Sequence, residues 1–565
     1  MPLGEKKVRR LTGLLLIAAT LATRLPFISR MLYEFDSIDF AVATFRFSIE
    51  QVTPHFPGYI LHVLFAKFLL LFIGDVNLTF VWISILLSIG SVLFLWRASA
   101  SLRGERVGLM AGMLWLFTPI FWFYGEVATA YVYEAFFACA FLYLGISLLR
   151  EPGRRWLVYF LFIALSLATG ARQSSIIFFV PCIIYVLWKT RQPVRIWAMG
   201  VTLFFIITGA WFMVLINYSG GIDAYFAQAG KETVYRSQSV LFGNSLRSHL
   251  SVISKVLLYL CVAALPFLFI FIASLSGYWK RSIAFIKAQL SKPTFLFTAF
   301  VALPPFLFYT GIYFMKAGYL LNILPGVALG GAVLLDQMTI WNAERIKRSS
   351  ENKLLLTRPI ITKQAIRNTA MVIALDLLLF FLPFPWLCEE YFDNSFTRDS
   401  LNLQESILDP KYGGGRGMFL NRLFSFCNVC GVILTDSLHS EVAEALKSAS
   451  THPSDLVILD TWWHRWGYYY QPQSLIYDIR DFPASDSLWI GESRNYIRKG
   501  IADSVITIPH NKKVLLLLRE DHPSFASIAR QMHLKRIELP QYLDMYQVTD
   551  EHFSFQWKNV RFVSE

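Results

Sequence analysis

Two aspartates stand three positions apart in an apolar, aromatic stretch near the start of the chain. Asp36 and Asp39 lie within the run Tyr33–Phe40, where a solvated charge has no obvious structural use. A spacing of three places both carboxylates on one face of a helix. Arg46 follows Asp39 by two further turns, so the segment is expected to form an amphipathic interfacial helix. A carboxylate in this setting can accept a proton. For Asp36, a functional role is therefore favoured over the alternative that it is simply a solvated surface charge.

Other charged side chains interrupt or border apolar runs later in the sequence. Glu126 follows an aromatic run, and Arg172 and Lys316 lie in short turns between apolar segments. Charges at membrane depth are costly and tend to mark pathways or sites. For Arg172 or Lys316 taken alone, anchoring to lipid headgroups is the favoured explanation. Together, however, these residues indicate a functional site, because carboxylates and cations from distant parts of the chain are all expected on the same face of the membrane.

The elements that must position these residues are apolar helices. The chain has 565 residues, of which 55% are hydrophobic and 16% charged, which is too apolar for an ordinary soluble fold. Several runs between residues 11 and 385 approach or reach the roughly 20 residues that a helix needs to cross a bilayer. The net charge of +13 agrees with Lys and Arg on cytosolic loops. No basic stripe interleaved with aromatic residues indicates nucleic-acid binding.

The basic clusters between the apolar runs predict the topology. Clusters that share the cytosolic side must be separated by an even number of crossings. The rule is satisfied if residues 56–73, which open with the helix breakers Pro57 and Gly58, form a juxtamembrane or re-entrant helix on the outer face. The remaining predicted crossings are eleven, at 11–29, 77–96, 107–124, 128–148, 156–171, 174–188, 196–216, 251–275, 294–313, 318–335 and 367–385.

This topology predicts an integral, multi-pass membrane protein with a cytosolic N-terminus. Residues 1–386 form the membrane domain, including an external loop at 30–73 with juxtamembrane helices. Residues 387–565 form a soluble extracytoplasmic domain. The plasma or inner membrane is favoured over the endoplasmic reticulum.

The polar tail predicts a small α/β domain. Strand-like runs lie at 456–459, 514–518 and 535–539, and helix-like stretches lie at 440–448 and 524–532. The aromatic cluster Trp462–Tyr470 also stands in this tail. It suits sugar stacking and contact with the membrane surface equally well, and both alternatives stay open. The predicted fold class is therefore a polytopic α-helical membrane protein with a C-terminal α/β domain.

Several motifs, in their order and spacing, resemble the GT-C superfamily of membrane glycosyltransferases. The motifs are Asp36–Asp39, His55–Tyr59, Phe121–Val127 and Lys316–Pro325. They look most like the protein O-mannosyltransferase-like branch that includes the TMEM260 type, and the resemblance covers most of residues 11–340. Where that branch tends to have Asp-Ser-Gly-Glu, this chain has Asp-Ser-Ile-Asp. Its second acid is therefore shorter.

The resemblance implies an enzyme that takes a sugar, a hexose or a pentose, from a polyprenyl-phosphate donor. The acceptor would be a protein or a glycolipid on the outer face of the lipid bilayer. Asp36 is implied as the general base that takes the proton of the acceptor hydroxyl. Asp39 or Glu126 is implied as the carboxylate that stabilises the positive charge of the transition state. One base and direct attack predict inversion at the anomeric carbon.

The resemblance also implies a binding site for the departing phosphate. Arg172 and Lys316 are the candidates, because the negative charge on the phosphate grows as the glycosidic bond breaks. The candidates for binding the sugar or the acceptor are His55, Tyr59, Gln173 and Tyr319. For His55 and Tyr59, helix capping or an interfacial position fits equally well.

The sequence leaves the metal requirement and two rival functions open. Asp36, Asp39 and Glu126 could together bind a divalent metal ion. Cationic side chains for the phosphate favour a metal-independent reaction, so no metal ligand is assigned. A secondary transporter would show internal repeats and ions at the membrane midplane, and the sequence shows no repeat. A lipid-binding scaffold would use the same topology without needing Asp36.

Overall fold

The structure is a computed structural model, and part of the chain is described in it. The described residues are 3–49, 53–236, 240–314, 316–349, 358–381, 429–450, 452–460, 469–470, 474–478, 487–492, 495–500, 504–517, 525–537, 545–557 and 560–565. The chain divides into two compact units, one made of residues 1–28, 56–387 and 402–432, and the other of residues 29–55, 388–401 and 433–565.

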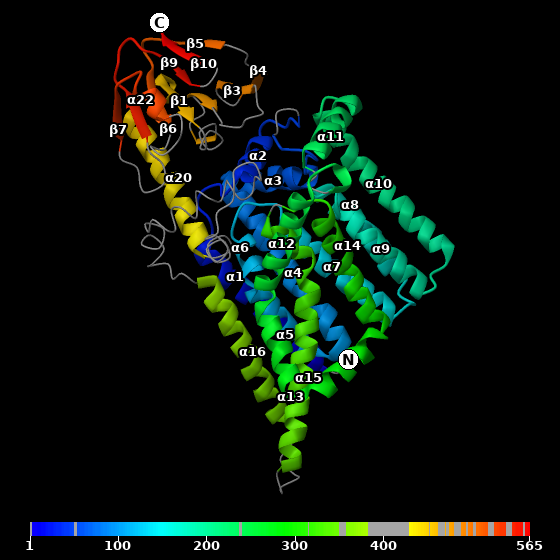
Figure 1. The fold of residues 1–565 in the computed structure, drawn as a ribbon. Helices are drawn as coiled ribbons and strands as arrows, with labels where there is room; N and C mark the ends of the chain where they lie inside the picture. Colours follow the sequence, from blue (N-terminus) through cyan, green and yellow to red (C-terminus); the bar gives the residue numbers. More distant parts are fainter. Residues whose placement is uncertain are drawn as a thin grey trace. The chain divides into compact units, whose positions relative to one another are not determined.

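The first unit consists of helices, most of which lie side by side in Figure 1. Its α-helices are α1 (Leu3–Arg24), α3 (Ile60–Ile73), α4 (Val76–Arg103), α5 (Glu105–Phe117), α6 (Pro119–Tyr124), α7 (Val132–Arg150), α8 (Trp156–Ala171), α9 (Ser175–Lys189), α10 (Val194–Tyr218), α11 (Ile222–Arg236), α12 (Leu246–Ala263), α13 (Leu265–Leu290), α14 (Pro293–Gly311), α15 (Leu324–Ser349) and α16 (Arg358–Phe381). Its 3-10 helices are η1 (Leu25–Phe27), η2 (Val240–Phe242) and η3 (Ala317–Asn322). Helix α4 packs along both α5 and α7, and these three form the centre of the unit.

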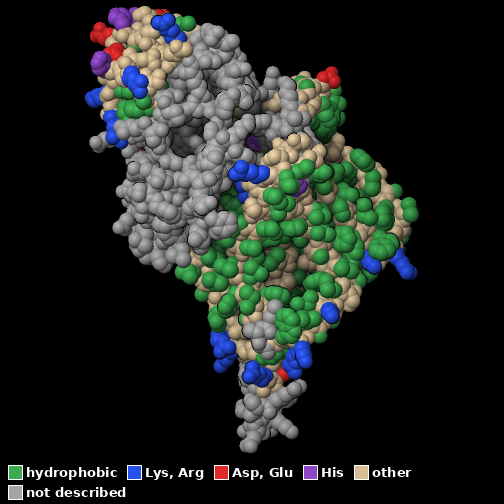
Figure 2. All heavy atoms as spheres, viewed as in Figure 1, with side chains coloured by type: hydrophobic (Ala, Val, Ile, Leu, Met, Phe, Trp, Pro, Cys, Tyr) green, Lys and Arg blue, Asp and Glu red, His purple; other side chains and the backbone are tan. Residues whose placement is uncertain are grey.

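The outer surface of the first unit is apolar. Figure 2 shows hydrophobic side chains over a wide area of the helices. Helix α10, for example, exposes Phe205, Ile206 and Met213. Hydrocarbon tolerates such a surface, and helices satisfy their own backbone hydrogen bonds there. Among the described residues, eight helices are long and apolar enough to cross a membrane, namely Lys6–Phe27, Val76–Arg103, Val132–Arg150, Val194–Tyr218, Leu246–Ala263, Pro293–Gly311, Leu324–Arg345 and Lys363–Phe381. The polytopic α-helical fold is therefore confirmed.

Three of the predicted crossings are formed by shorter helices. Helices α8 and α9 have 16 and 15 residues. The predicted crossing 107–124 is divided at Thr118 into α5 and α6, because Pro119 begins a new helix. A helix of 16 residues is about 24 Å long, less than the about 30 Å of hydrocarbon in a typical bilayer. The count of eleven crossings and its sidedness stay predictions.

The segment 56–73 forms α3, a helix of 14 residues. Gly58 precedes it with a φ of 102°, a left-handed conformation that favours glycine. Helix α3 is about 21 Å long, shorter than the hydrocarbon layer, as are α8 and α9. The juxtamembrane or re-entrant placement of this segment therefore stays a prediction.

Basic side chains lie where the topology predicts cytosolic segments. In Figure 2, Lys and Arg side chains gather at the end of the first unit where α13, α15 and α16 lie. The exposed basic residues of these helices include Lys280, Arg281, Lys287, Arg345, Lys363 and Arg367. The positive-inside rule would place this end in the cytosol.

The second unit contains two β-sheets, α2 (Phe35–Ala43), α22 (Phe525–Ala529), η6 (Pro453–Asp455) and most of α20 (Val429–Ala449), from residue 433 onward. The larger sheet has the order β4-β3-β2-β1-β6-β8-β7. Its strands are β1 (Leu456–Asp460), β2 (Leu475–Asp478), β3 (Ser487–Glu492), β4 (Asn495–Gly500), β6 (Lys513–Leu517), β7 (Leu534–Ile537) and β8 (Met545–Val548). The smaller sheet has the order β5-β10-β9, with strands β5 (Ser504–Ile508), β9 (Ser554–Trp557) and β10 (Val560–Ser564).

The centre of the larger sheet is parallel. Strand β1 pairs with β2 and β6 in parallel, with Val457 opposite Leu475 and Val514. The outer pairs are antiparallel. The buried side chains of Val457 and Val514 belong to a core that also includes Ile528 of α22. The predicted strands correspond to β1, β6 and β7, and the predicted helices correspond to α20 and α22, so the α/β fold of the tail is confirmed.

Two features predicted for the tail lie outside the described residues. They are the boundary at residue 387 and residues 462–468 of the aromatic cluster. Tyr469 and Tyr470 of that cluster are described, and their rings contact each other edge to face.

Candidate active site

Helix α2 positions the two aspartates. Glu34 caps its N-terminus through a reciprocal pair of hydrogen bonds, in which its side chain accepts from the backbone N–H of Ser37 and the Ser37 hydroxyl accepts from the backbone N–H of Glu34. Asp36 lies in the first turn, where the helix dipole favours a negative charge. Asp39 follows one turn later. The predicted helix is thus present, but it ends at Ala43, so the prediction that it extends to Arg46 is wrong.

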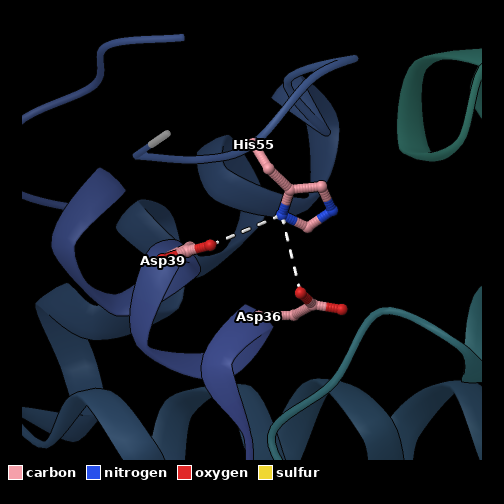
Figure 3. A group of neighbouring side chains, drawn as sticks. All are labelled: Asp36, Asp39 and His55. Carbon is pink, nitrogen blue, oxygen red and sulfur yellow. Dashed lines mark ion pairs between the residues drawn. The ribbon is translucent and has the colours of Figure 1, made fainter. Parts of the chain in front are cut away.

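Asp36, Asp39 and His55 form one cluster (Figure 3). The Nδ1 atom of His55 lies 3.8 Å from Asp36 Oδ1 and 3.6 Å from Asp39 Oδ2. A single β-bridge between Ser48 and Thr53 brings the chain back toward the helix before His55. The Asp36 side chain is 24% exposed, whereas those of Asp39 and His55 are 7% exposed. Asp36 is therefore the carboxylate of this cluster that a substrate can reach most easily.

The same cluster has the donor atoms of a metal site. One ligand atom from each of Asp36, Asp39 and His55 lies within 4.8 Å of the others. Two carboxylates and an imidazole fit a divalent ion such as Zn²⁺ or Mn²⁺. In the described part of the chain, the third member of this group is His55, whereas the sequence had suggested Glu126.

Arg172 lies in the turn between α8 and α9 and makes a buried ion pair. Its Nε donates to Oε1 of Glu134 on α7 at 2.8 Å, and the exposed fractions of the two side chains are 10% and 0%. The guanidinium carbon lies 4.3 Å from the centre of the Tyr319 ring and 5.4 Å from that of Tyr131. Cation–π contacts of this kind stabilise a desolvated guanidinium. Arg172 is therefore fixed by an acid and two aromatic rings.

Lys316 joins the same cluster from the turn before η3. Its Nζ lies 5.8 Å from the centre of the Tyr131 ring, the ring that Arg172 also contacts. Gly318 lets η3 come this close, because a Cβ at that position would lie 2.5 Å from Cγ of Tyr131. The two predicted phosphate ligands, which are far apart in the sequence, thus meet at one aromatic ring.

The guanidinium of Arg172 has only part of its hydrogen-bonding capacity used within the described residues. Its Nη1 is buried and has no hydrogen-bond partner among the described residues. A buried N–H without an acceptor is costly, so this atom is a strong donor for an incoming anion. The planar fork of Arg suits a phosphate particularly well.

Glu134 and Tyr309 belong to this site, although the sequence analysis did not single them out. The Tyr309 hydroxyl donates to Glu134 Oε1 at 3.4 Å, and the Tyr309 ring stacks on Tyr319 with centroids 5.0 Å apart. An acid inside the apolar run 128–148 was the available signal for Glu134. Nothing in its sequence context identifies Arg172 as its partner.

Gln173 follows Arg172 and connects this turn with the segment that contains Tyr59. The side-chain amide of Gln173 donates to the Tyr225 hydroxyl at 2.8 Å and to the carbonyl oxygen of Pro57 at 3.3 Å. These bonds connect the Arg172 turn with α11 and with the segment that precedes α3. Tyr59 is the N-cap residue of α3.

Glu126 is part of the interior of the first unit. It is fully buried, and the positive charge that acts on it is that of Arg24 of α1, whose side chain is also buried. Burial raises the pKa of Glu126 well above its ordinary value, and the charge of Arg24 opposes this shift. Arg24 in turn donates to the carbonyl oxygen of Leu116 at 2.8 Å. The structure places Glu126 beside Arg24, and its role in catalysis stays a prediction.

The comparisons with known proteins agree with this architecture. Residues 56–215 match the sequence model of a family described as dolichyl-phosphate-mannose-protein mannosyltransferase. The matched segment contains Tyr59, Glu134 and Arg172. No curated protein sequence matches the chain.

Two solved structures of ArnT from Cupriavidus metallidurans have a similar fold. The one bound to undecaprenyl phosphate is 12% identical, with a TM-score of 0.53, over 97% of this chain and 98% of that chain. The apo form is 13% identical, with a TM-score of 0.53, over 94% and 97% of the two chains. The chain is thus an integral membrane protein with the fold of the GT-C superfamily, and the predicted resemblance to that superfamily is confirmed. The assignment to the TMEM260-type branch stays a prediction.

Proposed function

We propose that this protein is a membrane glycosyltransferase. It moves a sugar from a polyprenyl-phosphate-linked donor to a protein or glycolipid acceptor. The observation that carries the proposal is the buried Arg172 with its unpartnered Nη1, beside Lys316 on a shared aromatic ring. The printed description of the matching family names a dolichyl-phosphate sugar, and the similar ArnT structure contains undecaprenyl phosphate. Both support a lipid-phosphate donor for this chain.

Arg172 and Lys316 bind the phosphate of the donor. When the bond between the sugar and the phosphate breaks, the leaving phosphate gains one negative charge. Nη1 of Arg172 and Nζ of Lys316 stabilise that charge more strongly than the charge of the intact donor. Glu134 fixes the orientation of the guanidinium through its bond to Nε. The aromatic rings of Tyr131 and Tyr319 exclude water from the cations.

Asp36 is the general base of the proposed reaction. The acceptor oxygen attacks the anomeric carbon, its proton moves to the Asp36 carboxylate, and the polyprenyl phosphate leaves from the opposite side. This single displacement inverts the anomeric configuration. Asp39 lies one turn away and is more deeply buried, so its negative charge stabilises the positive charge that develops on the sugar. His55, between the two carboxylates, orients them.

Tyr319 is proposed to contact the sugar, because its ring lies against the guanidinium of Arg172. Tyr59, at the N-terminus of α3, is proposed to contact the sugar as well. Gln173 is proposed to act indirectly, since its amide is already bonded to Tyr225 and Pro57.

The test of this function is transfer by the purified protein in liposomes. Polyprenyl-phosphate mannose is the first donor to try, followed by other hexoses and pentoses, with membrane proteins and glycolipids as acceptors. The expected result is release of free polyprenyl phosphate together with a glycosylated acceptor of inverted configuration, measured by mass spectrometry and NMR. Binding of every donor without turnover would favour a lipid-binding scaffold, and passage of the intact lipid or a solute across the bilayer would favour a transporter.

A further inference from the structure

The segment that joins α1 to α2 is bound to residues from the far end of the sequence. This segment, Ser29–Leu32, lies just before the helix that carries Asp36 and Asp39. Its hydrogen-bond partners include Asp436 of α20 and Tyr470. All of these residues belong to the second compact unit.

Asp436 binds three successive residues of this segment. Its Oδ2 accepts from the backbone N–H of Arg30 at 2.6 Å, and its Oδ1 accepts from the backbone N–H of Met31 at 2.9 Å. The hydroxyl of Ser29 lies 2.8 Å from Oδ1. Both carboxylate oxygens are therefore used, as in the strong charge-assisted bonds that order loops. These bonds are made to a different segment of the chain and are not needed to stabilise helix α20 itself.

Tyr470 continues the same contact by one residue. Its hydroxyl oxygen accepts from the backbone N–H of Leu32 at 3.0 Å. Three consecutive backbone N–H groups, those of Arg30, Met31 and Leu32, thus donate to side chains of the C-terminal region. Glu34, two residues later, caps α2. The contact therefore ends where the helix of the proposed catalytic carboxylate begins.

We infer that Asp436 and Tyr470 are positioning residues, through which the C-terminal domain fixes the place of α2 and so of Asp36. This inference rests on the proposed function only in assigning a catalytic role to Asp36. It gives Asp436 and Tyr470 a part in the reaction that does not depend on their own contact with the substrate. The fixed segment keeps Asp36 in place while a lipid-linked donor and a bulky acceptor enter and leave.

Partial burial makes the ionised form of Asp436 energetically unfavourable. Burial raises the pKa of Asp436, and the hydrogen bonds from Arg30, Met31 and Ser29 oppose this shift only in part. The cost of desolvating this charge offsets much of the free energy that its hydrogen bonds contribute, so the net effect of Asp436 on global stability is expected to be small. Removal of the charge should therefore loosen the segment without lowering the melting temperature of the protein.

The test compares Asp436→Asn with a matched control in the full-length protein. In the variant, one backbone N–H of the segment faces an amide NH2 group, so at least one bond is lost. Glu444→Gln removes an exposed acid of the same helix and is the control. Tyr470→Phe removes the second contact with little change in shape and serves as an independent variant.

Two measurements decide the outcome. Backbone hydrogen exchange at Arg30 and Met31 should become about tenfold faster or more in Asp436→Asn, and unchanged in Glu444→Gln. Transfer kcat should fall about tenfold to a hundredfold in Asp436→Asn, as expected for a displaced base, with the KM for the donor and the melting temperature unchanged. Tyr470→Phe should show the same pattern with smaller changes.

Unchanged exchange at Arg30 and Met31 would overturn the anchoring contact itself. Faster exchange with a wild-type kcat would overturn the positioning role. If the wild-type protein transferred no sugar from any donor, the proposed function would fail. The exchange measurement would still decide whether Asp436 anchors the segment.

Discussion

At the scale of single residues, the proposed function depends on two small groups of charged side chains. One is Asp36 with Asp39 and His55, and the other is Arg172 with Lys316. These residues could be predicted from the sequence, because a charged side chain beside an apolar run costs free energy and therefore tends to mark a functional site. It did not predict Glu134 as the partner of Arg172, because two helices must pack before the pair exists.

The ion pair between Glu134 and Arg172 should contribute strongly to stability. Glu134→Gln leaves a buried guanidinium charge without its partner, so the free energy of unfolding should fall by about 3 kcal/mol. The measurement is a denaturation curve of the purified protein in detergent. Glu151→Gln is the control, because Glu151 pairs with Arg154 on the exposed surface. The control should change stability by less than about 0.5 kcal/mol. Equal effects of the two variants would show that the buried pair is not formed.

The proposed reaction assigns the phosphate to cationic side chains, which predicts independence from metal. Treatment with a chelator should leave the rate of transfer unchanged, although Asp36, Asp39 and His55 have the donor atoms of a metal site. The check is transfer with and without EDTA, followed by addition of Mn²⁺ or Zn²⁺. Loss of activity that returns with added metal would instead give this cluster the role of a metal centre.

At the scale of elements, the phosphate site depends on how closely η3 approaches α7. The sequence predicted apolar runs on both sides of Lys316, but not that Gly318 would lie against Tyr131. The local sequence patterns also did not predict where some helices end. The helix of Asp36 stops at Ala43 instead of reaching Arg46, and Thr118 divides a predicted crossing. Helix ends are set by caps and proline positions, which hydropathy alone does not measure.

Gly318→Ala tests the approach of η3. The added Cβ would lie 2.5 Å from Cγ of Tyr131, so η3 must move away from this ring, which both Lys316 and Arg172 contact. The expected loss of stability is about 1–3 kcal/mol, together with weaker binding of polyprenyl phosphate in a direct binding assay.

Gly330→Ala is the matched control for that variant. A Cβ at Gly330, within α15, meets nothing within 4 Å. This variant should keep wild-type affinity and gain up to about 1 kcal/mol of stability. Wild-type affinity in both variants would contradict the proposed place of Lys316 in the phosphate site.

At the scale of the whole molecule, hydropathy and charge predicted the polytopic fold and the α/β tail. They did not predict that residues 29–55 would group with the C-terminal residues in one compact unit. That grouping depends on contacts such as those of Asp436 with Arg30 and Met31. A single sequence carries no local signal for bonds over such a separation.

The predicted topology is tested by labelling single cysteines. The expected result is that Lys280→Cys reacts with a membrane-impermeant maleimide only from the cytosolic side, and Lys512→Cys only from the other side. The reason is that an odd number of crossings separates the N-terminus from the tail. Both variants are made in a background in which all six native cysteines are replaced by serine, because Cys261 is exposed and the tail also contains Cys388, Cys427 and Cys430. Labelling of both positions from one side would contradict the odd count.

The central claim is that Asp36 takes the proton of the acceptor during sugar transfer. The most direct measurement compares single-turnover transfer and donor binding in wild-type protein, Asp36→Asn and Glu444→Gln. Asp36→Asn should lower the rate of transfer about a hundredfold to ten-thousandfold, the usual contribution of a general base. Its affinity for the polyprenyl-phosphate donor should stay at the wild-type value, and Glu444→Gln should behave as wild type in both respects. A wild-type rate of transfer in Asp36→Asn would contradict the account.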